Sequence, residues 1–252
     1  MIAPSPTPRP NEFVTYRSGI DRYLRLSEYI RMELTVGQVA HAYDRSERLV
    51  QLALRSGALA GHRTIGRVTT MDDIAARAWS RSLAHGRPWT PDVRDAALDV
   101  LSDGHTSRLT ASERSRLKAR LSSLTARDIA HAAGGLGTWA RYRGDALDAS
   151  IRIGPSAVDA ARLGIVPGEG WLAFIQTDNL DRSELEHDVT LDADGNLGVV
   201  QRPSIDERTA RILLDTYLLG DARQSAAAAS ALEERRPSER LTSVRGGKRA
   251  GP

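Results

Sequence analysis

The side chains best suited to bind another molecule lie between residues 45 and 67, where arginine, amide and hydroxyl groups recur at short intervals. Arg48 and Gln51 are three positions apart, so a helix would place both on one face. Arginine can form two parallel hydrogen bonds with guanine, and glutamine can do the same with adenine. Ser46 with Arg45 could hold a phosphate at the start of that helix. This chemistry suits the major groove of double-stranded DNA.

More polar side chains follow around Gly66, and we expect them to contact the DNA backbone or the minor groove. Glu47 would repel phosphate unless it accepts a hydrogen bond from the amino group of cytosine. A winged helix used only for protein contacts is the alternative to DNA binding. The candidate DNA-binding residues are Arg45, Ser46, Glu47, Arg48, Gln51, Arg55, His62, Arg63, Thr64 and Arg67.

Helix starts in this chain follow one pattern, a threonine with a polar side chain three residues later. The threonine hydroxyl can cap the first turn while the later side chain bonds back to the threonine backbone. This pattern accounts for half of the near-repeat between "LTVGQVAHA", beginning at Leu34, and "LTARDIAHA", beginning at Leu124. Three capping boxes are expected: Thr35 with Gln38, Thr110 with Glu113, and Thr125 with Asp128.

The residues after each copy differ, and so does the predicted structure. After the first copy, Asp44 to Ser46 form a polar turn, Ser46 caps a second helix, and Gly57 ends that helix. Two short strands around Gly66 and a helix from "MDDIAARAW" complete a winged helix-turn-helix. After the second copy, glycines are followed by a strand-like alternation at 138–143, so a degenerate second DNA-binding unit stays an open alternative. The buried stripe of the second helix is expected at Leu49, Val50, Ala53 and Leu54.

Enzyme chemistry has little support in the sequence. The GxxxxGK[ST] phosphate-binding loop and the HExxH pair are both missing, and the six histidines are scattered. His41 and His131, at matching places in the two copies, are expected to be half-buried structural imidazoles. The carboxylates of 178–188 are more typical of a solvated helix face than of a cation site, and Asp145 and Asp148 have the wrong spacing for a nucleotidyltransferase pair. We therefore expect no enzyme activity, no cofactor and no metal.

Charge is distributed unevenly along the chain. Residues 34–90 carry eight basic and four acidic side chains, whereas 151–236 carry nine basic and fifteen acidic ones. The part from Pro237 carries four basic side chains and one acidic one. A basic N-terminal part and an acidic C-terminal part suggest two modules with different partners. The chain has no cysteine, and no apolar run approaches the roughly 20 residues that span a bilayer, so we expect a cytoplasmic protein without membrane contact.

The predicted fold class is mostly α with an α/β C-terminal domain. The C-terminal part is expected to hold a short helix at 156–164, a buried strand in "WLAFIQT", a hairpin turned at Asp194-Gly195, and two helices broken at Gly220. The predicted segments are a disordered arm over 1–18, a winged helix-turn-helix domain over 19–86 with a leading helix at 19–32, a helical linker region over 87–135, a small α/β domain over 136–236, and a disordered basic tail over 237–252.

Residues 34–74 resemble the excisionase-type (MerR-like) winged helix-turn-helix. The departures from that family are Tyr43-Asp44 in place of the usual Leu-Gly, Gln51 in place of a common aromatic residue, and one extra residue in the wing. The resemblance implies a DNA-binding fold for these forty or so residues. The matching positions are Leu34, Thr35, Val39, Ala40, Ser46, Val50, Arg55, Ser56, Gly57, Leu59, Arg63, Gly66 and Arg67.

Nearly the whole chain also resembles actinobacterial helix-turn-helix proteins related to AbiEi-type antitoxins. The resemblance rests on "GRPWTPDVRDAALDVLSDG", "LTASERSRLKARL", "WARYRG", "DGNLGVV" and "ARILLDTYLLGDAR". It implies an autorepressing antitoxin whose acidic C-terminal domain meets a nucleotidyltransferase-like toxin. The alternative is an excisionase-like architectural factor that bends DNA in phage or mobile-element recombination. A single wing module reads few base pairs, so a homodimer is a further expectation.

Overall fold

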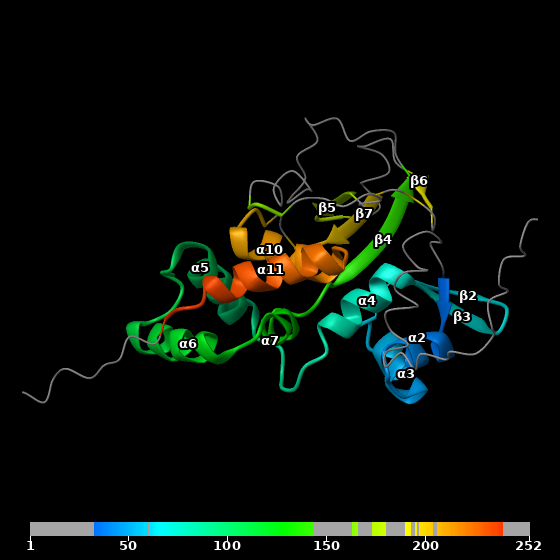
Figure 1. The fold of residues 1–252 in the computed structure, drawn as a ribbon, viewed down its shortest axis with the longest axis horizontal. Helices are drawn as coiled ribbons and strands as arrows, with labels where there is room; N and C mark the ends of the chain where they lie inside the picture. The colour runs from blue at the N-terminus through cyan, green and yellow to red at the C-terminus, as the bar shows by residue number, and fades with distance from the viewer. Residues whose placement is uncertain are drawn as a thin grey trace, which may run out of the picture.

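The computed structural model describes residues 33–59, 61–143, 163–165, 173–179, 190–192, 195, 197–203 and 206–238. Within these residues the chain is a mixed α/β protein of helices and two small sheets (Figure 1). The arm over 1–18, the leading helix over 19–32, most of the helix expected at 156–164 and the tail from 239 lie outside the described residues. So does the carboxylate segment after Asn179.

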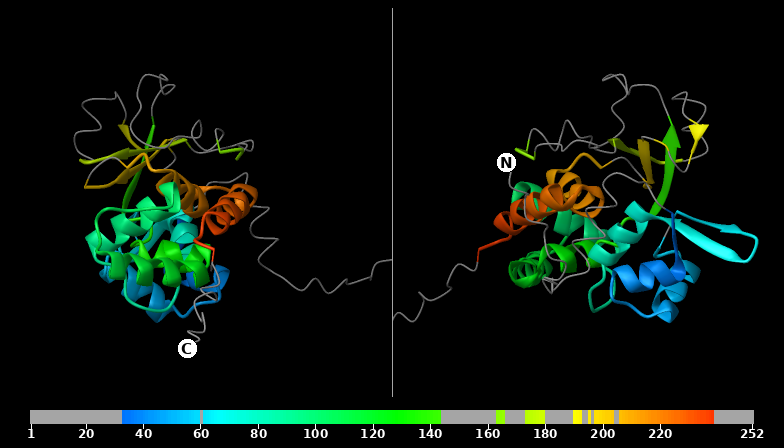
Figure 2. Two further views of the ribbon diagram at one scale, coloured as in Figure 1. Left: turned by 90° about the vertical axis from the view of Figure 1, so that its left-hand side faces the viewer. Right: turned by 45° about the vertical axis from the view of Figure 1, so that its right-hand side comes forward.

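The N-terminal part combines a helix pair with a three-stranded antiparallel sheet. The strands are ordered β1-β3-β2, so the hairpin strand β3 also pairs with the first strand. The hairpin projects from the body of the molecule (Figure 2). The elements are β1 (Glu33–Thr35), α2 (Val36–Ala42), α3 (Glu47–Arg55), β2 (His62–Ile65), β3 (Val68–Asp72) and α4 (Asp73–Arg81).

The helices of the middle segment pack around a helix from the C-terminal part. The helix α10 (Thr209–Leu219) contacts α4, α5, α7 and α11, and it is buried on every side from Ala210 to Leu219. A helix that is apolar around most of its circumference is stable only inside a core. Three of these helices are α5 (Pro91–Asp103), α7 (Ala126–Ala132) and α11 (Ala222–Glu234), and α6 (Ala111–Ser123) contacts α5.

Most of the buried apolar side chains of the described residues form one cluster that runs from Val39 to Leu232. Core packing therefore does not separate the segments expected as domains, and α5 to α7 share their core with α10 and α11 instead of only linking two modules. The boundaries at 86 and 135 stay predictions. The two helices expected around Gly220 are confirmed as α10 and α11.

The second sheet corrects one expectation about strand pairing. Its order is β5-β7-β4-β6, with β5 parallel to β7 and the other neighbours antiparallel. The strands expected to form a hairpin around Asp194-Gly195 are not neighbours, because β4 lies between them, so that prediction is wrong. The strand expected in "WLAFIQT" is confirmed for its last five residues. The strands are β4 (Thr138–Arg143), β5 (Ala173–Thr177), β6 (Thr190–Leu191) and β7 (Leu197–Gln201).

All three expected capping boxes are present, at the starts of α2, α6 and α7. The near-repeat therefore reflects two helices with the same start. The second helix, α7, is followed by three glycines in left-handed conformations and then by strand β4, so residues 124–143 do not repeat the helix pair. His131 is half-buried as expected, with its ring nitrogens 3.1 and 2.9 Å from the carbonyl oxygens of Ser82 and Gly86. His41 is exposed, so its expected burial is wrong.

Buried charges inside the C-terminal part are paired with one another. Asp215 is fully buried on α10, with Arg202 Nη2 2.6 Å and Arg211 Nη1 3.5 Å from its Oδ1. Gln176 donates to the other carboxylate oxygen of Asp215 at 3.0 Å. Arg208 extends this network to Asp95 and Asp99 of α5. Since an unpaired buried charge is costly, these contacts also fix how α10 sits between sheet and helices.

Candidate nucleic-acid interface

The helix pair α2–α3 is built by local signals and closed by a small apolar core. Ser46 caps α3, its hydroxyl accepting from the backbone N–H of Leu49 at 3.3 Å. Val39 and Ala40 of α2 are buried with the inward face of α3, where Val50 and Ala53 are buried and Leu49 and Leu54 partly buried. The expected stripe is thus confirmed. Its burial leaves the opposite face of α3 in solvent.

The turn between these helices contains a strained residue. Asp44 has a φ of 50°, the one positive φ among the described non-glycine residues. L-residues adopt this left-handed conformation at a cost, and aspartate and asparagine tolerate it better than most. Glycine would adopt this conformation without that cost. Aspartate keeps the turn without glycine.

The exposed face of α3 carries the polar side chains expected to bind DNA. Arg48, Gln51 and Arg55 are all exposed, so neither of the two candidate base-reading side chains is covered by the described part of the protein. Glu47 is exposed too, and its Oε1 lies 3.2 Å from the point that a Cβ on Gly37 would occupy. A carboxylate is favourable at this place, beside the first turn of α2. Glu47 therefore lies close to α2 whether or not it meets a base.

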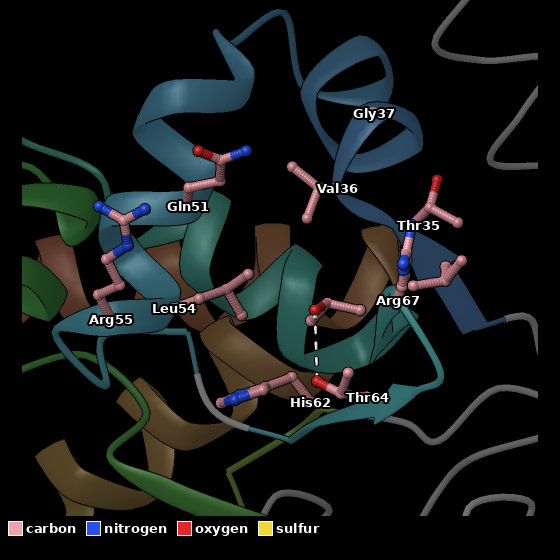
Figure 3. A pocket seen from close by; sticks show the side chains of 11 residues that line it. Thr35, Val36, Gly37, Gln51, Leu54, Arg55, His62, Thr64 and Arg67 are labelled. Carbon is pink, nitrogen blue, oxygen red and sulfur yellow. Dashed lines mark hydrogen bonds between the residues drawn. The ribbon is translucent and has the colours of Figure 1, made fainter.

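The β2–β3 hairpin stands opposite α3 and turns at Gly66, whose φ is +63°. Successive side chains of a strand point to opposite faces. Thus His62 and Thr64 face α3, and the Thr64 hydroxyl lies 3.3 Å from that of Thr69 (Figure 3). Arg63 points to the other face, where its Nε lies 2.6 Å from Oε1 of Glu33. The polar residues of the hairpin therefore lie on two opposite faces.

A groove of about 580 Å³ lies between α3 and the hairpin. Side chains of α3 form one wall and those of the hairpin the other, as Figure 3 shows. None of the residues that line it is acidic, and Arg55 and Arg67 make it basic. The lining residues are Thr35, Val36, Gly37, Gln51, Leu54, Arg55, His62, Thr64, Arg67, Val68 and Thr69.

The ten predicted site residues are thus all exposed but fall into three groups. Gln51, Arg55, His62, Thr64 and Arg67 line the groove. Arg45, Ser46, Glu47 and Arg48 lie outside it, at the start of α3 and on its outer face. Arg63 lies on the other face of the hairpin, where it pairs with Glu33.

Several groove residues were not predicted from sequence. Thr35, Val36 and Gly37 reach the groove because β1 pairs with β3 and brings the start of α2 beside the hairpin. A strand of three residues is too short for a periodic pattern to reveal it. Val68 and Thr69 reach the groove through the hairpin register with β2. The capping box at Thr35 was the one available signal, and it located the helix but not its neighbour.

Besides the shared core, two groups of contacts among the described residues help to attach this part to the rest of the protein. Arg81, at the end of α4, donates to the carbonyl oxygens of Tyr217, Leu218 and Gly220 at 3.0, 2.9 and 2.6 Å. It thereby satisfies backbone acceptors that every helix leaves free at its C-terminal end. The Tyr217 hydroxyl donates in return to the Arg81 carbonyl at 3.1 Å. These bonds clamp α4 to α10.

The second contact joins the hairpin to β4. Arg141 is buried with its Nε 2.9 Å from Oδ2 of Asp72, the residue that ends β3 and caps α4. Burial raises the pKa of Asp72 to about 6, against the opposing effects of the Arg141 charge and two backbone N–H groups. Trp139 of β4 packs so closely on Gly61 that a Cβ there would lie 2.8 Å from its ring. The hairpin is therefore held at its base, while Ile65, Gly66 and Arg67 at its tip are exposed within the described part of the chain.

Comparisons with known protein families, curated proteins and solved structures found no match to this chain. The described residues include no helix long and apolar enough to cross a membrane, and no group of three or more potential metal-ligating side chains.

Proposed function

We propose that this chain binds double-stranded DNA through a winged helix-turn-helix formed by α2, α3 and the β2–β3 hairpin. The observation that carries the proposal is the basic groove between α3 and the hairpin, beside an exposed α3 face bearing Arg48, Gln51 and Arg55. An α-helix of this kind fits the major groove, and a phosphate strand can pass between helix and wing.

The roles within the interface follow from side-chain chemistry. Arg48 and Gln51 are the base-reading candidates, since they can bond in pairs to guanine and adenine. Arg67 and Arg45 are suited to phosphates, which position a protein without reading sequence. Arg55 lies at the corner between the outer face of α3 and the groove, within reach of either. Thr64 and His62 can donate hydrogen bonds to backbone oxygens from the opposite wall.

The test is a binding series with the full chain and duplexes selected from a random-sequence library. Affinity should fall with salt, with a log–log slope of about −0.9 for each phosphate that is neutralised. Arg48→Ala or Gln51→Ala should cost about 1–3 kcal/mol on the selected duplex and much less on random DNA. Arg116→Ala, at an exposed position on α6, is the matched control. Absence of duplex binding at low salt would end the proposal, and equal losses on both DNAs would remove base reading.

The biological role that we propose is autorepression by the antitoxin of a toxin–antitoxin pair. Its support is the resemblance of the chain to AbiEi-related proteins and the acidic surplus over 151–236. Two of these carboxylates are not available to a partner, since Asp206 and Asp215 are paired with arginines inside the fold. A toxin contact would need the remaining carboxylates. Co-expression with a nucleotidyltransferase-like neighbour gene tests the idea, because rescue of growth is expected only from a true partner.

A further inference from the structure

An apolar side chain interrupts the polar outer face of α3. Leu52 is 59% exposed, whereas the other two leucines of the same helix, Leu49 and Leu54, pack against the core. The large apolar residues that are exposed within the described part of the chain are few, namely Leu52, Ile65, Val68 and Leu191. Three of these four belong to α3 and the hairpin. Exposed apolar surface therefore concentrates where the proposed DNA contact lies.

Helical spacing places Leu52 in a row with two arginines. Arg48 is four residues before Leu52 and Arg55 three residues after it, and such positions share one face of a helix. Both arginines are exposed. The leucine is thus held between two cations on the side of α3 that points away from the core. Whatever covers Leu52 must be apolar at one point and anionic or rich in acceptors on both sides.

The major groove of DNA has this combination. Its base edges offer acceptors to arginine, its rims carry phosphates, and the C5 methyl of thymine is its apolar group. We propose that Leu52 contacts a thymine methyl, so that the site prefers thymine at one position between the bases or phosphates met by Arg48 and Arg55. This inference rests on the proposed DNA-binding function and adds a specificity-determining residue to it.

A second copy of this chain fits the same surface poorly. A twofold contact through Leu52 places the same patch of both copies face to face. Four arginines, Arg48 and Arg55 from each copy, would then gather around two leucines. Like charges at this spacing repel, and the apolar area of one leucine pair is small. The charge of the row therefore favours a nucleic acid.

The test compares thymine with deoxyuridine, which differs only by the missing methyl group. Each thymine of a selected duplex is replaced in turn, and affinities are measured for the full chain, for Leu52→Ala and for Leu191→Ala. The unmodified chain should lose about three- to fivefold at one thymine, the expected effect of one buried methyl group. Leu52→Ala should bind the two duplexes equally. Leu191→Ala removes an equally exposed leucine on β6 and should keep the discrimination.

The outcomes separate this inference from the function on which it rests. If Arg48→Ala weakens binding but Leu52→Ala keeps the preference for thymine, the thymine contact is overturned and the proposed DNA binding stands. If Leu52→Ala loses affinity by the same factor on the thymine and the deoxyuridine duplex, the thymine contact is also overturned, since Leu52 would then contact something other than the methyl group. A change in the sedimentation of Leu52→Ala without DNA supports a protein contact instead. Circular dichroism confirms folding, which the exposure of Leu52 should preserve.

Discussion

Arg63 and Glu33 form an ion pair on the outer side of the β2–β3 hairpin, with 2.6 Å between Nε and Oε1. Glu33 also accepts a hydrogen bond from the Thr70 hydroxyl at 2.7 Å. The pair ties β1 to β2 across β3, the central strand of this sheet. It holds the guanidinium of Arg63 away from the groove that Arg67 lines.

This geometry predicts different effects for two arginines of one hairpin. Arg67→Ala should weaken binding to all duplexes by about three- to tenfold, because a phosphate contact is lost whatever the sequence. It should also reduce the slope of log affinity against log salt by about 1. Arg63→Ala should leave affinity almost unchanged, because the pair with Glu33 holds the Arg63 guanidinium away from the groove. Loss of this exposed ion pair should lower the stability of the fold by at most about 1 kcal/mol. Fluorescence anisotropy at several salt concentrations measures both. Equal losses for the two variants would contradict the two-sided hairpin.

The clamp between α4 and α10 should be important for stability. Arg81→Met keeps much of the apolar stem but removes the bonds to the Tyr217, Leu218 and Gly220 carbonyls. Leaving such acceptors unsatisfied should lower the free energy of unfolding by about 2–4 kcal/mol. Urea denaturation gives the value, with Arg87→Met at an exposed loop position as the control. A loss below about 0.5 kcal/mol would show that solvent replaces the clamp.

Asp72 should make stability depend on pH in the weakly acidic range. Its pKa is about 6 in the fold, against an ordinary value of 3.8 for an aspartate carboxyl. The folded state therefore holds the proton more tightly, and this contribution to stability is complete below the unfolded pKa and lost as pH rises through about 6. Relative to Asp72→Asn, the free energy of unfolding should fall between about pH 4 and pH 6. Nuclear magnetic resonance titration of the carboxyl checks the cause. A pKa below 3.8 would mean that Arg141 outweighs burial.

The turn at Asp44 gives a prediction about backbone strain. Asp44→Gly should stabilise the protein by up to about 1 kcal/mol, because glycine adopts a φ of 50° without a Cβ clash. Asp44→Ala should destabilise it by about 1 kcal/mol, because alanine lacks the tolerance of aspartate for this conformation. Thermal and urea unfolding compare the two. Similar stabilities for the glycine and alanine variants would show that strain at this turn is unimportant.

Local signals in the sequence predicted the starts of helices well. Each capping box involves side chains three residues apart, so Thr35, Thr110 and Thr125 needed no distant partner to mark a helix. The exposed face of α3 followed equally from a 3.6-residue period of apolar side chains. Strand pairing was harder, as the hairpin expected around Gly195 shows. There β4, about fifty residues earlier in the chain, lies between the two strands.

The sequence by itself determined which residues of α3 meet solvent, because helix period and caps act over three or four neighbours. Only the tertiary structure decided which polar residues share a groove. The pairing of β1 with β3 brings Thr35 beside the hairpin, and the two-residue alternation of β2 turns His62 inward and Arg63 outward. The physical reason is that a strand sets the faces of its side chains only once its register with distant strands is fixed.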